Sequence, residues 1–317
     1  MTNLATTNLC RLIPFVLLGA AGFGQSPDGE IHVLPVQGNV YMLVGAGGNI
    51  AVQVGSQGVL LVDSGLANMS DKVLAAVRKL SDKPIRYLLN THVHPDHIGG
   101  NEAVARTGVA STGLPVQGTP GSSASQAVQI LAHENVLNRM SGAKIPGVAW
   151  PTDTFFNDEK EVYFNGEGVQ MFHPSGAAHT DGDSIVYFRR SDVIASGDLF
   201  VTTSYPIIDA SRGGNVQGVI DGLNLILDLA IPAHQQEGGT YIIPGHGRLC
   251  DEADVLEYRD MVTIIRDRIR DATKRGMTLD QIKAARLTRD YDARYGSGSG
   301  ATEVFVEAVY KSLATKK

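Results

Sequence analysis

The chain has 317 residues, of which 43% are hydrophobic and 19% are charged, and it carries a formal net charge of −6. A chain of this length can bury one large domain and still leave residues for an appendage. Its acidic balance disfavours a polyanion-binding surface, so we expect no nucleic-acid partner.

The amino terminus has the pattern of a signal peptide. Residues 12–23 form an apolar stretch, preceded by Arg11 and followed by small residues, which predicts a removable segment over residues 1–24 and an exported, periplasmic or secreted protein. A stretch this short is not expected to form a stable membrane anchor. Cys10 precedes the apolar run, which argues against a lipid-modified cysteine. Removal would leave Cys250 without an intrachain disulfide partner.

From residue 25 to residue 251, short apolar strands alternate with helical patterns, which predicts one α/β domain. Strands are expected within residues 31–62, at 85–89, 184–188, 193–195 and 241–243. Helical faces are expected over residues 73–80 and after the Gly213-Gly214-Asn215 sequence. Residues 111–125 are rich in Gly, Ser, Thr and Pro, which predicts a loop or lid.

Residues 252–317 are predicted to form a helical extension. The first helix is expected to be capped by Asp254 and to end at Gly276, and a second short helix to start at Thr278. A glycine-rich linker at residues 296–300 precedes a third helix over about 302–313. Packing against the domain is the favoured role of this extension. Pairing with another subunit and shaping a substrate pocket are the alternatives, and the sequence does not specify the oligomeric state.

A compact polar cluster, Thr91-His92-Val93-His94-Pro95-Asp96-His97, follows the strand predicted at 85–89. On an extended segment His92 and His94 project to one side, so both imidazoles can bind one metal ion. Asp96 and His97 come after the bend at Pro95, where a second ion could bind. The cluster therefore predicts a metal site on a loop that leaves a buried strand.

Three further polar residues lie beside the predicted strands and next to glycine-rich sequence. His179 precedes the strand at 184–188, Asp198 follows the strand at 193–195, and His246 follows the strand at 241–243. Loops at strand ends commonly carry functional residues, so each is a candidate to complete the coordination of two ions.

In this pattern the chain resembles the metallo-beta-lactamase superfamily, whose hallmark is His-x-His-x-Asp-His followed by a distant His, a bridging Asp and a last His. The resemblance covers roughly residues 31–251. It implies a four-layer αββα sandwich with a metallo-beta-lactamase-fold domain over residues 25–251. It also implies two Zn²⁺ ions, with iron or manganese possible. The implied ligands are His92, His94 and His179 for the first ion, Asp96, His97 and His246 for the second, and Asp198 as the bridge.

Several other polar residues have more than one interpretation. Asp63 and Asp183 could accept a hydrogen bond from a ligand imidazole or fix the metal loop; a plain turn or strand cap is as good an interpretation for Asp183. His133 lies at a strand-to-helix junction and could reach the pocket, whereas His173 is expected to pack at a strand end. His32 and His234 are expected to be exposed. In lactonase-like relatives a tyrosine follows the bridging Asp closely, and Tyr205 comes later, so its role stays open.

The resemblance implies a hydrolase in which a metal-bridging hydroxide attacks the substrate, with Asp96 as the catalytic residue that orients it. Asp198 stands where one lactamase subclass has cysteine, which favours relatives such as glyoxalase II thioesterases and lactonases. Export favours beta-lactams or lactones, so cleavage of an acyl bond in a small molecule is our main expectation. The alternatives are a glyoxalase II-like thioesterase, an iron-dependent oxygenase or redox protein, and a binding module with structural metals. No flavin-binding module is visible in the sequence.

Overall fold

The computed structural model describes residues 29–109, 127–297 and 300–314. The predicted signal peptide, residues 1–24, and the predicted loop, residues 111–125, lie outside these ranges. Among the helices of the described ranges, none combines the length and the apolar character that crossing a bilayer requires.

The strands form two sheets, one of seven strands and one of five. The first sheet begins as an antiparallel meander and continues with parallel pairs from β4 onward. In spatial order its strands are β1 (His32–Gln37), β2 (Val40–Val44), β3 (Ile50–Gly55), β4 (Gly58–Val62), β5 (Ile85–Leu89), β6 (Gln129–His133) and β7 (Asp153–Phe155). The second sheet is antiparallel except for its β11–β12 pair. In spatial order its strands are β12 (Tyr241–Ile243), β11 (Val193–Ala195), β10 (Ile185–Phe188), β9 (Glu167–Phe172) and β8 (Glu159–Phe164).

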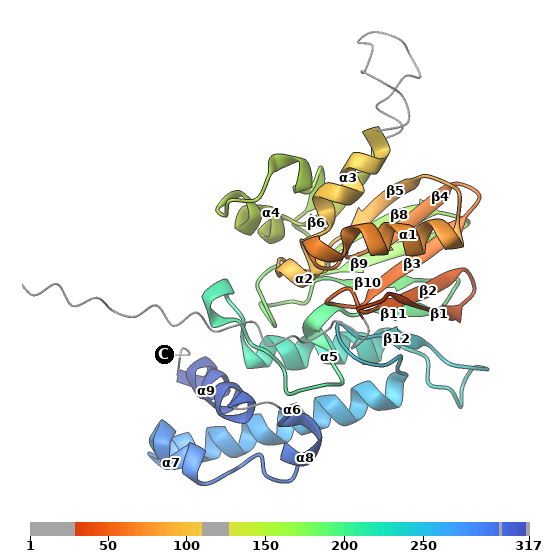
Figure 1. The fold of residues 1–317 in the computed structure, drawn as a ribbon. Helices are drawn as coiled ribbons and strands as arrows, with labels where there is room; N and C mark the ends of the chain where they lie inside the picture. The colour runs from red at the N-terminus through yellow and green to blue at the C-terminus, as the bar shows by residue number, and fades with distance from the viewer. Residues whose placement is uncertain (1–28, 110–126, 298–299, 315–317) are drawn as a thin grey trace, which may run out of the picture.

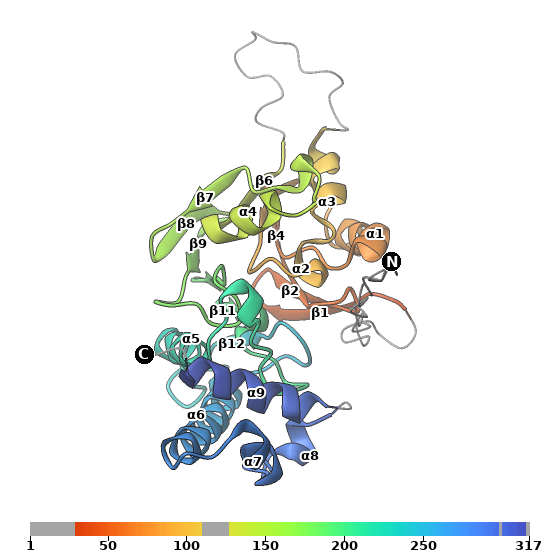
Figure 2. The ribbon, with the colours of Figure 1, turned by 90° about the vertical axis from the view of Figure 1, so that its left-hand side faces the viewer.

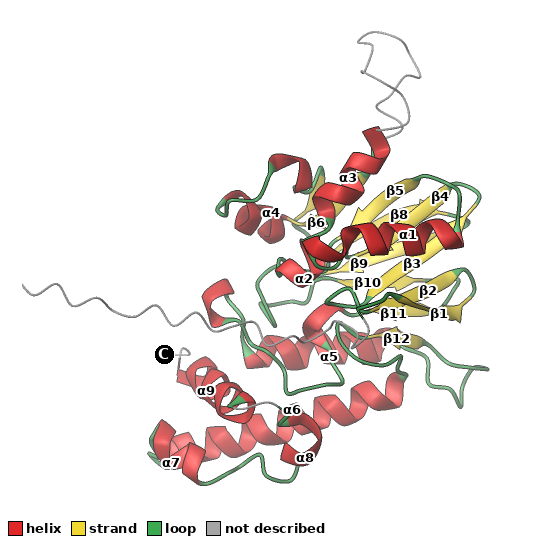
Figure 3. Ribbon diagram, in the orientation of Figure 1, coloured by secondary structure: helices red, strands yellow, loops and turns green. Residues whose placement is uncertain are grey.

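Helices cover the outer face of each sheet (Figures 1 and 3). The helices of the domain are α1 (Ser70–Leu80), α2 (Pro95–Ile98), α3 (Asn101–Val109), α4 (Glu134–Ser141) and α5 (Val216–Leu229). The helices of the extension are α6 (Glu252–Lys274), α7 (Leu279–Ala284), α8 (Asp292–Tyr295) and α9 (Ala301–Ala314). The predicted αββα sandwich with a carboxy-terminal helical region is therefore confirmed.

The alternation of side chains along β4 shows how the layers are held together. Leu60 and Val62 belong to the hydrophobic cluster between the two sheets. Val59 and Leu61 belong to the cluster beneath α1 and α3. Successive side chains of a strand point to opposite faces, so a strand buried on both faces is apolar throughout. The continuous apolar sequence of β4 is thus a consequence of its central place.

The extension packs on the outer side of the second sheet. Helices α5, α6, α7 and α9 share one hydrophobic cluster, which also contains Ile194 of β11. Figures 1 and 2 both show α6 to α9 gathered beyond α5. The predicted boundary after residue 251 stays a prediction, since this cluster is continuous across it.

The structure corrects the predicted start of the first extension helix. Asp251, not Asp254, is the N-cap of α6, because Asp251 has extended backbone angles and its side chain accepts a hydrogen bond from Asp254 N. Asp254 is the third helical residue and completes a capping box. The sequence analysis also missed the short helix α8, which lies between the predicted second and third helices.

Candidate metal centre

The seven predicted ligands lie together where loops leave the two sheets. Within each of two groups the candidate ligand atoms lie within 4.8 Å of one another: His92, His94, His179 and Asp198 form the first group, and Asp96, His97 and His246 form the second. The first sheet supplies four of the seven through the loop after β5 and helix α2. The second sheet supplies the rest through the loops after β9, β11 and β12. The folding of distant loops to one edge thus assembles both groups.

The carboxylate of Asp198 lies between the two groups. Its Oδ2 is 3.6 Å from His179 Nε2 and 3.9 Å from His92 Nε2. Its Oδ1 is 3.2 Å from His97 Nε2 and 3.5 Å from His246 Nε2. One oxygen therefore faces each group, which is the arrangement that a bridging carboxylate requires.

The donor set fits divalent metal ions. His92 Nε2, His97 Nε2 and Asp198 Oδ1 are buried and have no hydrogen-bond partner among the described residues. Buried polar atoms without partners are rare in native proteins, and a metal ion is one of the groups that satisfies them. Imidazole nitrogen and carboxylate oxygen suit zinc, iron and manganese.

The electrostatics of the metal-free site keep two of the donors, His92 and Asp198, in the forms that bind metal. Burial, reinforced by the neighbouring imidazoles of His97 and His179, holds the pKa of His92 well below its ordinary value, so this imidazole is neutral at pH 7. Burial would raise the pKa of Asp198, but His246 and His97 outweigh it and hold that pKa well below its usual range. A neutral imidazole and an ionised carboxylate are the forms that bind metal. Burial would lower the pKa values of His97 and His246, but neighbouring carboxylates, Asp198 above all, outweigh it and raise the pKa of His97 well above its ordinary value and that of His246 to about 9, so a bound ion would displace a proton from each of these imidazoles.

Asp63 fixes the orientation of two residues, Thr91 and His97, in the ligand-bearing segment that follows β5. Its Oδ2 lies 2.7 Å from His97 Nδ1 and accepts a hydrogen bond from Thr91 Oγ1, and its Oδ1 accepts one from Thr91 N. A carboxylate at Nδ1 places the proton there and leaves Nε2 of His97 free to bind an ion. Asp63 has a positive φ of 65°, which is costly for a residue other than glycine and which the surrounding hydrogen bonds maintain.

Asp183 holds the loop of His179 without touching its imidazole. Its carboxylate accepts hydrogen bonds from the backbone N and the hydroxyl of Thr180. Burial raises the pKa of Asp183 to about 7. The Nδ1 of His179 instead lies 2.6 Å from the carbonyl oxygen of Ile207, which leaves its Nε2 facing the first group.

Asp209 is a site residue that the sequence analysis missed. Its Oδ2 lies 3.0 Å from His94 Nε2, so Nδ1 of His94 is the nitrogen that faces His179. Its Oδ1 accepts hydrogen bonds from the backbone N of Ser211 and of Arg212. This short-range bonding marks a turn in the sequence. Nothing in the local sequence indicates the contact with His94, which lies 115 positions away.

The other histidines lie outside the two ligand groups. The rings of His133 and His173 stack with centroids 3.8 Å apart, and His133 Nδ1 accepts a hydrogen bond from Asn135 N at the start of α4. Burial and the adjacent His173 lower the pKa of His133 to about 4. His32 and His234 are exposed. Tyr205 is buried among the extension helices instead of lying at the ligands.

Comparison with known proteins identifies the family. A family model described as the metallo-beta-lactamase superfamily matches residues 34–246, and the chain belongs to this superfamily. A linear primary-alkylsulfatase of Pseudomonas sp. (strain ATCC 19151) is 27% identical over 71% of this chain and 47% of its own length. A metallo-beta-lactamase type 2 of Bacillus sp. (strain 170) is 24% identical over 65% of this chain and 69% of its own length. The chain thus spans about half the length of the sulfatase it matches.

Solved structures agree on the fold. A metallo-beta-lactamase from Pontibacter korlensis superposes with a TM-score of 0.56 and 16% identity, covering 74% of this chain and 99% of that one. The sec-alkylsulfatase Pisa1 from Pseudomonas sp. superposes with a TM-score of 0.65 and 16% identity, covering 89% of this chain and 50% of that one. The family model thus establishes the superfamily, the superpositions agree with its fold, and the described residues include a histidine–aspartate cluster that could hold metal ions.

Proposed function

We propose that the protein is a dinuclear metal-dependent hydrolase that cleaves an acyl bond, such as an amide, ester, lactone or thioester, in a small molecule. The observation that carries this proposal is the position of Asp198, with one carboxylate oxygen toward each group of imidazoles. A site for one ion would not need a carboxylate placed between two sets of donors.

Two bound divalent ions would supply Lewis-acid activation of water and of the substrate's reacting oxygen. The residues of the chain would bind these ions and leave one side open to substrate. The side chain of Asp96 is 26% exposed, whereas that of Asp198 is 6% exposed. Asp96 is therefore the carboxylate that substrate and attacking water can reach.

Asp96 would orient the attacking water and accept its proton. Its Oδ2 lies 3.2 Å from His246 Nε2 and 3.7 Å from His97 Nε2, so it also belongs to the second group. Replacement of a positioned general base lowers turnover by roughly 100-fold or more. We expect Asp96→Ala to lower kcat far more than it raises KM.

A substrate screen with metal-loaded protein tests this function. The compounds are a cephalosporin, an acyl lactone, a glutathione thioester and a phosphodiester, with Asp96→Ala as the inactive variant. Asp153→Ala is a matched control, since Asp153 lies on β7 of the first sheet, where it pairs with Lys160 of β8 and not with the predicted ligands. Hydrolysis of the cephalosporin or lactone, lost in Asp96→Ala alone, supports the proposal. Activity on the phosphodiester alone would overturn the acyl preference.

A second candidate reaction is hydrolysis of an alkyl sulfate ester. It is favoured by the 27% identity with the linear primary-alkylsulfatase over 261 residues. A primary alkyl sulfate is therefore added to the screen. Release of inorganic sulfate without activity on any acyl compound would favour this reaction over the first.

Metal analysis tests the redox alternative. The nitrogen and oxygen donors also suit iron. Two equivalents of zinc per chain are expected in the active protein. Bound iron together with substrate-dependent consumption of oxygen would show that the protein is an oxygenase and not a hydrolase.

We also propose that the protein is exported. The proposal rests on the apolar stretch at residues 12–23 and the small residues that follow it. Expression of the full chain, fractionation and amino-terminal sequencing test it. A mature protein beginning near residue 25 in the exported fraction is expected, and an intact amino terminus in the cytoplasmic fraction would contradict it.

A further inference from the structure

One loop carries much of the support for the metal ligands. We call residues 197–215, between β11 and α5, the metal-site loop. It contains Asp198 itself, the Ile207 carbonyl 2.6 Å from His179 Nδ1, and the Asp209 carboxylate 3.0 Å from His94 Nε2. The loop therefore sets the position of one ligand and the ring orientation of two others.

The middle of the metal-site loop is bonded to the carboxy-terminal extension. Residues 203–205 make hydrogen bonds with α6, with α8 and with the segments on either side of α8. The bonds are Ser297 Oγ to Thr203 O (3.0 Å), Tyr258 OH to Ser204 O (3.1 Å), Tyr205 N to Tyr295 O (3.0 Å), and Tyr205 OH to Asp292 Oδ1 (3.0 Å) and to Thr288 O (3.2 Å).

Tyr205 is the residue through which these contacts converge. Tyr205 is 2% exposed, and its ring stacks on Phe305 of α9 with centroids 4.8 Å apart and planes 6° from parallel. Burial and the Asp292 carboxylate raise the pKa of Tyr205, so its hydroxyl stays protonated and donates to that carboxylate. Tyr205 lies two positions before Ile207 and four before Asp209.

We propose that the carboxy-terminal extension holds the metal-site loop in its ligand-binding conformation and that Tyr205 is the positioning residue that joins them. This inference rests on the proposed metal site and assigns a role to the extension. A long loop has a large conformational entropy when its ends alone are fixed. Fixing its midpoint divides it into shorter spans, and each span then places its ligand contacts with a smaller loss of entropy.

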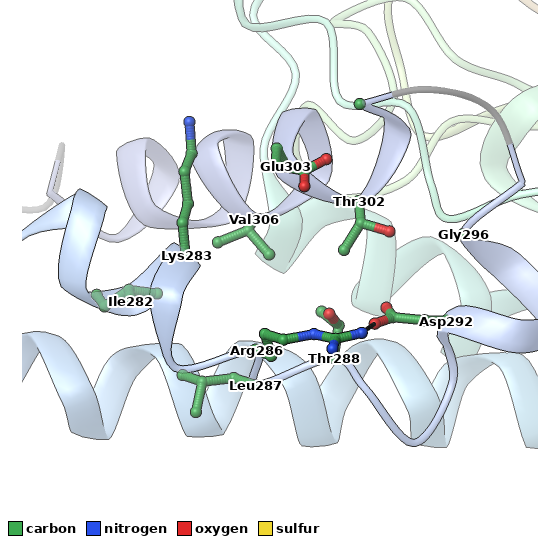
Figure 4. A pocket seen from close by; sticks show the side chains of 11 residues that line it. Ile282, Lys283, Arg286, Leu287, Thr288, Asp292, Gly296, Thr302, Glu303 and Val306 are labelled. Carbon is green, nitrogen blue, oxygen red and sulfur yellow. Dashed lines mark ion pairs between the residues drawn. The ribbon is translucent and has the colours of Figure 1, made fainter.

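The surroundings of Asp292 allow its hydrogen bond with Tyr205 to be removed by mutation while the protein still folds. Asp292 and Thr288 line a cavity of about 290 Å³ between α7, α8 and α9, shown in Figure 4. Arg286 lies beside Asp292, with Nη2 3.7 Å from Oδ2. Truncation of Asp292 would enlarge a cavity that is already open to water, so the variant is expected to fold. Tyr205→Phe keeps the ring that stacks on Phe305 and removes the hydroxyl alone.

The experiment compares Tyr205→Phe, Asp292→Ala and Asp292→Asn, with Ile282→Val as control. Ile282 is a fully buried residue of α7, and its change removes one methylene from the same hydrophobic cluster. Affinity for Co²⁺ and Zn²⁺ is measured by chelator competition, and the Co²⁺ absorption spectrum reports the coordination. Hydrogen–deuterium exchange of residues 197–215 is measured in the metal-free proteins.

Tyr205→Phe and Asp292→Ala are expected to bind metal roughly tenfold more weakly, the lower end of the effect of losing an outer partner of a ligand. Residues 197–215 should exchange faster in both variants. Asp292→Asn keeps an acceptor oxygen and should recover most of the affinity. Ile282→Val should lower the melting temperature by a few degrees, about as much as Tyr205→Phe and Asp292→Ala do, and should leave the metal affinity unchanged.

Wild-type metal affinity and wild-type loop exchange in Tyr205→Phe would overturn the proposal. Equal loss of affinity in Ile282→Val would also overturn it, since a general loss of stability would then account for the effect. If the wild-type chain binds no metal, the proposed function fails. The exchange of the metal-free loop then still decides whether the extension positions it.

Discussion

The contact between Asp209 and His94 gives the sharpest test of the site. The side chain of Asp209 is 14% exposed, and its Oδ2 lies 3.0 Å from His94 Nε2. Asp209→Ala removes the group that holds the proton on Nε2 and directs Nδ1 toward the first metal group. Such partners change metal affinity by about 10- to 100-fold, which corresponds to about 1.4 to 2.7 kcal/mol.

The upper part of that range is expected here because of Arg212. Its Nη1 pairs with Asp209 Oδ2 and lies 3.5 Å from His94 Nε2. Without the carboxylate, an unpaired guanidinium would face the ligand and oppose the binding of a cation. Asp209→Asn keeps an oxygen that accepts from His94 and should show a smaller loss than Asp209→Ala.

Zinc titration against a chromophoric chelator measures this effect. Asp209 contacts His94, a ligand of the first group, and no ligand of the second. We therefore expect the variant to bind one of its two zinc ions more weakly and the other with unchanged affinity. Asp153→Ala serves as the control carboxylate and should leave both equivalents unchanged. Equal affinities in wild type and Asp209→Ala would refute the role of Asp209, and equal weakening of both equivalents would refute its assignment to the first ion.

Three further outcomes are expected. Glu167→Ala should lower the free energy of unfolding, measured in urea, by about 3 to 5 kcal/mol. The reason is that the buried Glu167 carboxylate accepts hydrogen bonds from Gln53 Nε2 and from both the backbone N and the hydroxyl of Ser191. A loss of under about 1 kcal/mol would contradict this. Gly245→Ala should abolish binding of metal measured by elemental analysis, because its Cβ would lie 2.0 Å from Asp198 Oδ1, and full metal content would show that the site tolerates the change. Burial raises the pKa of Cys250 to about 12, so peptide mapping should find this thiol unmodified by iodoacetamide at pH 8 in the folded protein and modified after unfolding, whereas rapid modification of the folded protein would contradict its burial.

The sequence predicted much of the fold because its signals are local. The apolar run of residues 59–62, the helical spacing after Asn215 and the Thr278-x-x-Gln281 pattern each correspond to an element of the structure. Backbone periodicity and capping depend on residues a few positions apart, so they can be interpreted without tertiary contacts. The cap of α6 shows the limit of such local signals. Asp251 and Asp254 can each cap a helix, and only the backbone angles of the folded chain show that Asp251 is the N-cap.

By itself, the sequence determined the layered α/β class and, through the spacing of His92, His94, Asp96 and His97, the type of site. The tertiary structure alone decided what supports the ligands. The contact of Asp209 with His94 and the burial of Tyr205 in the extension join residues far apart in the chain. Such contacts depend on how layers pack, and a linear pattern of residue types does not encode the direction in which a carboxylate or hydroxyl points.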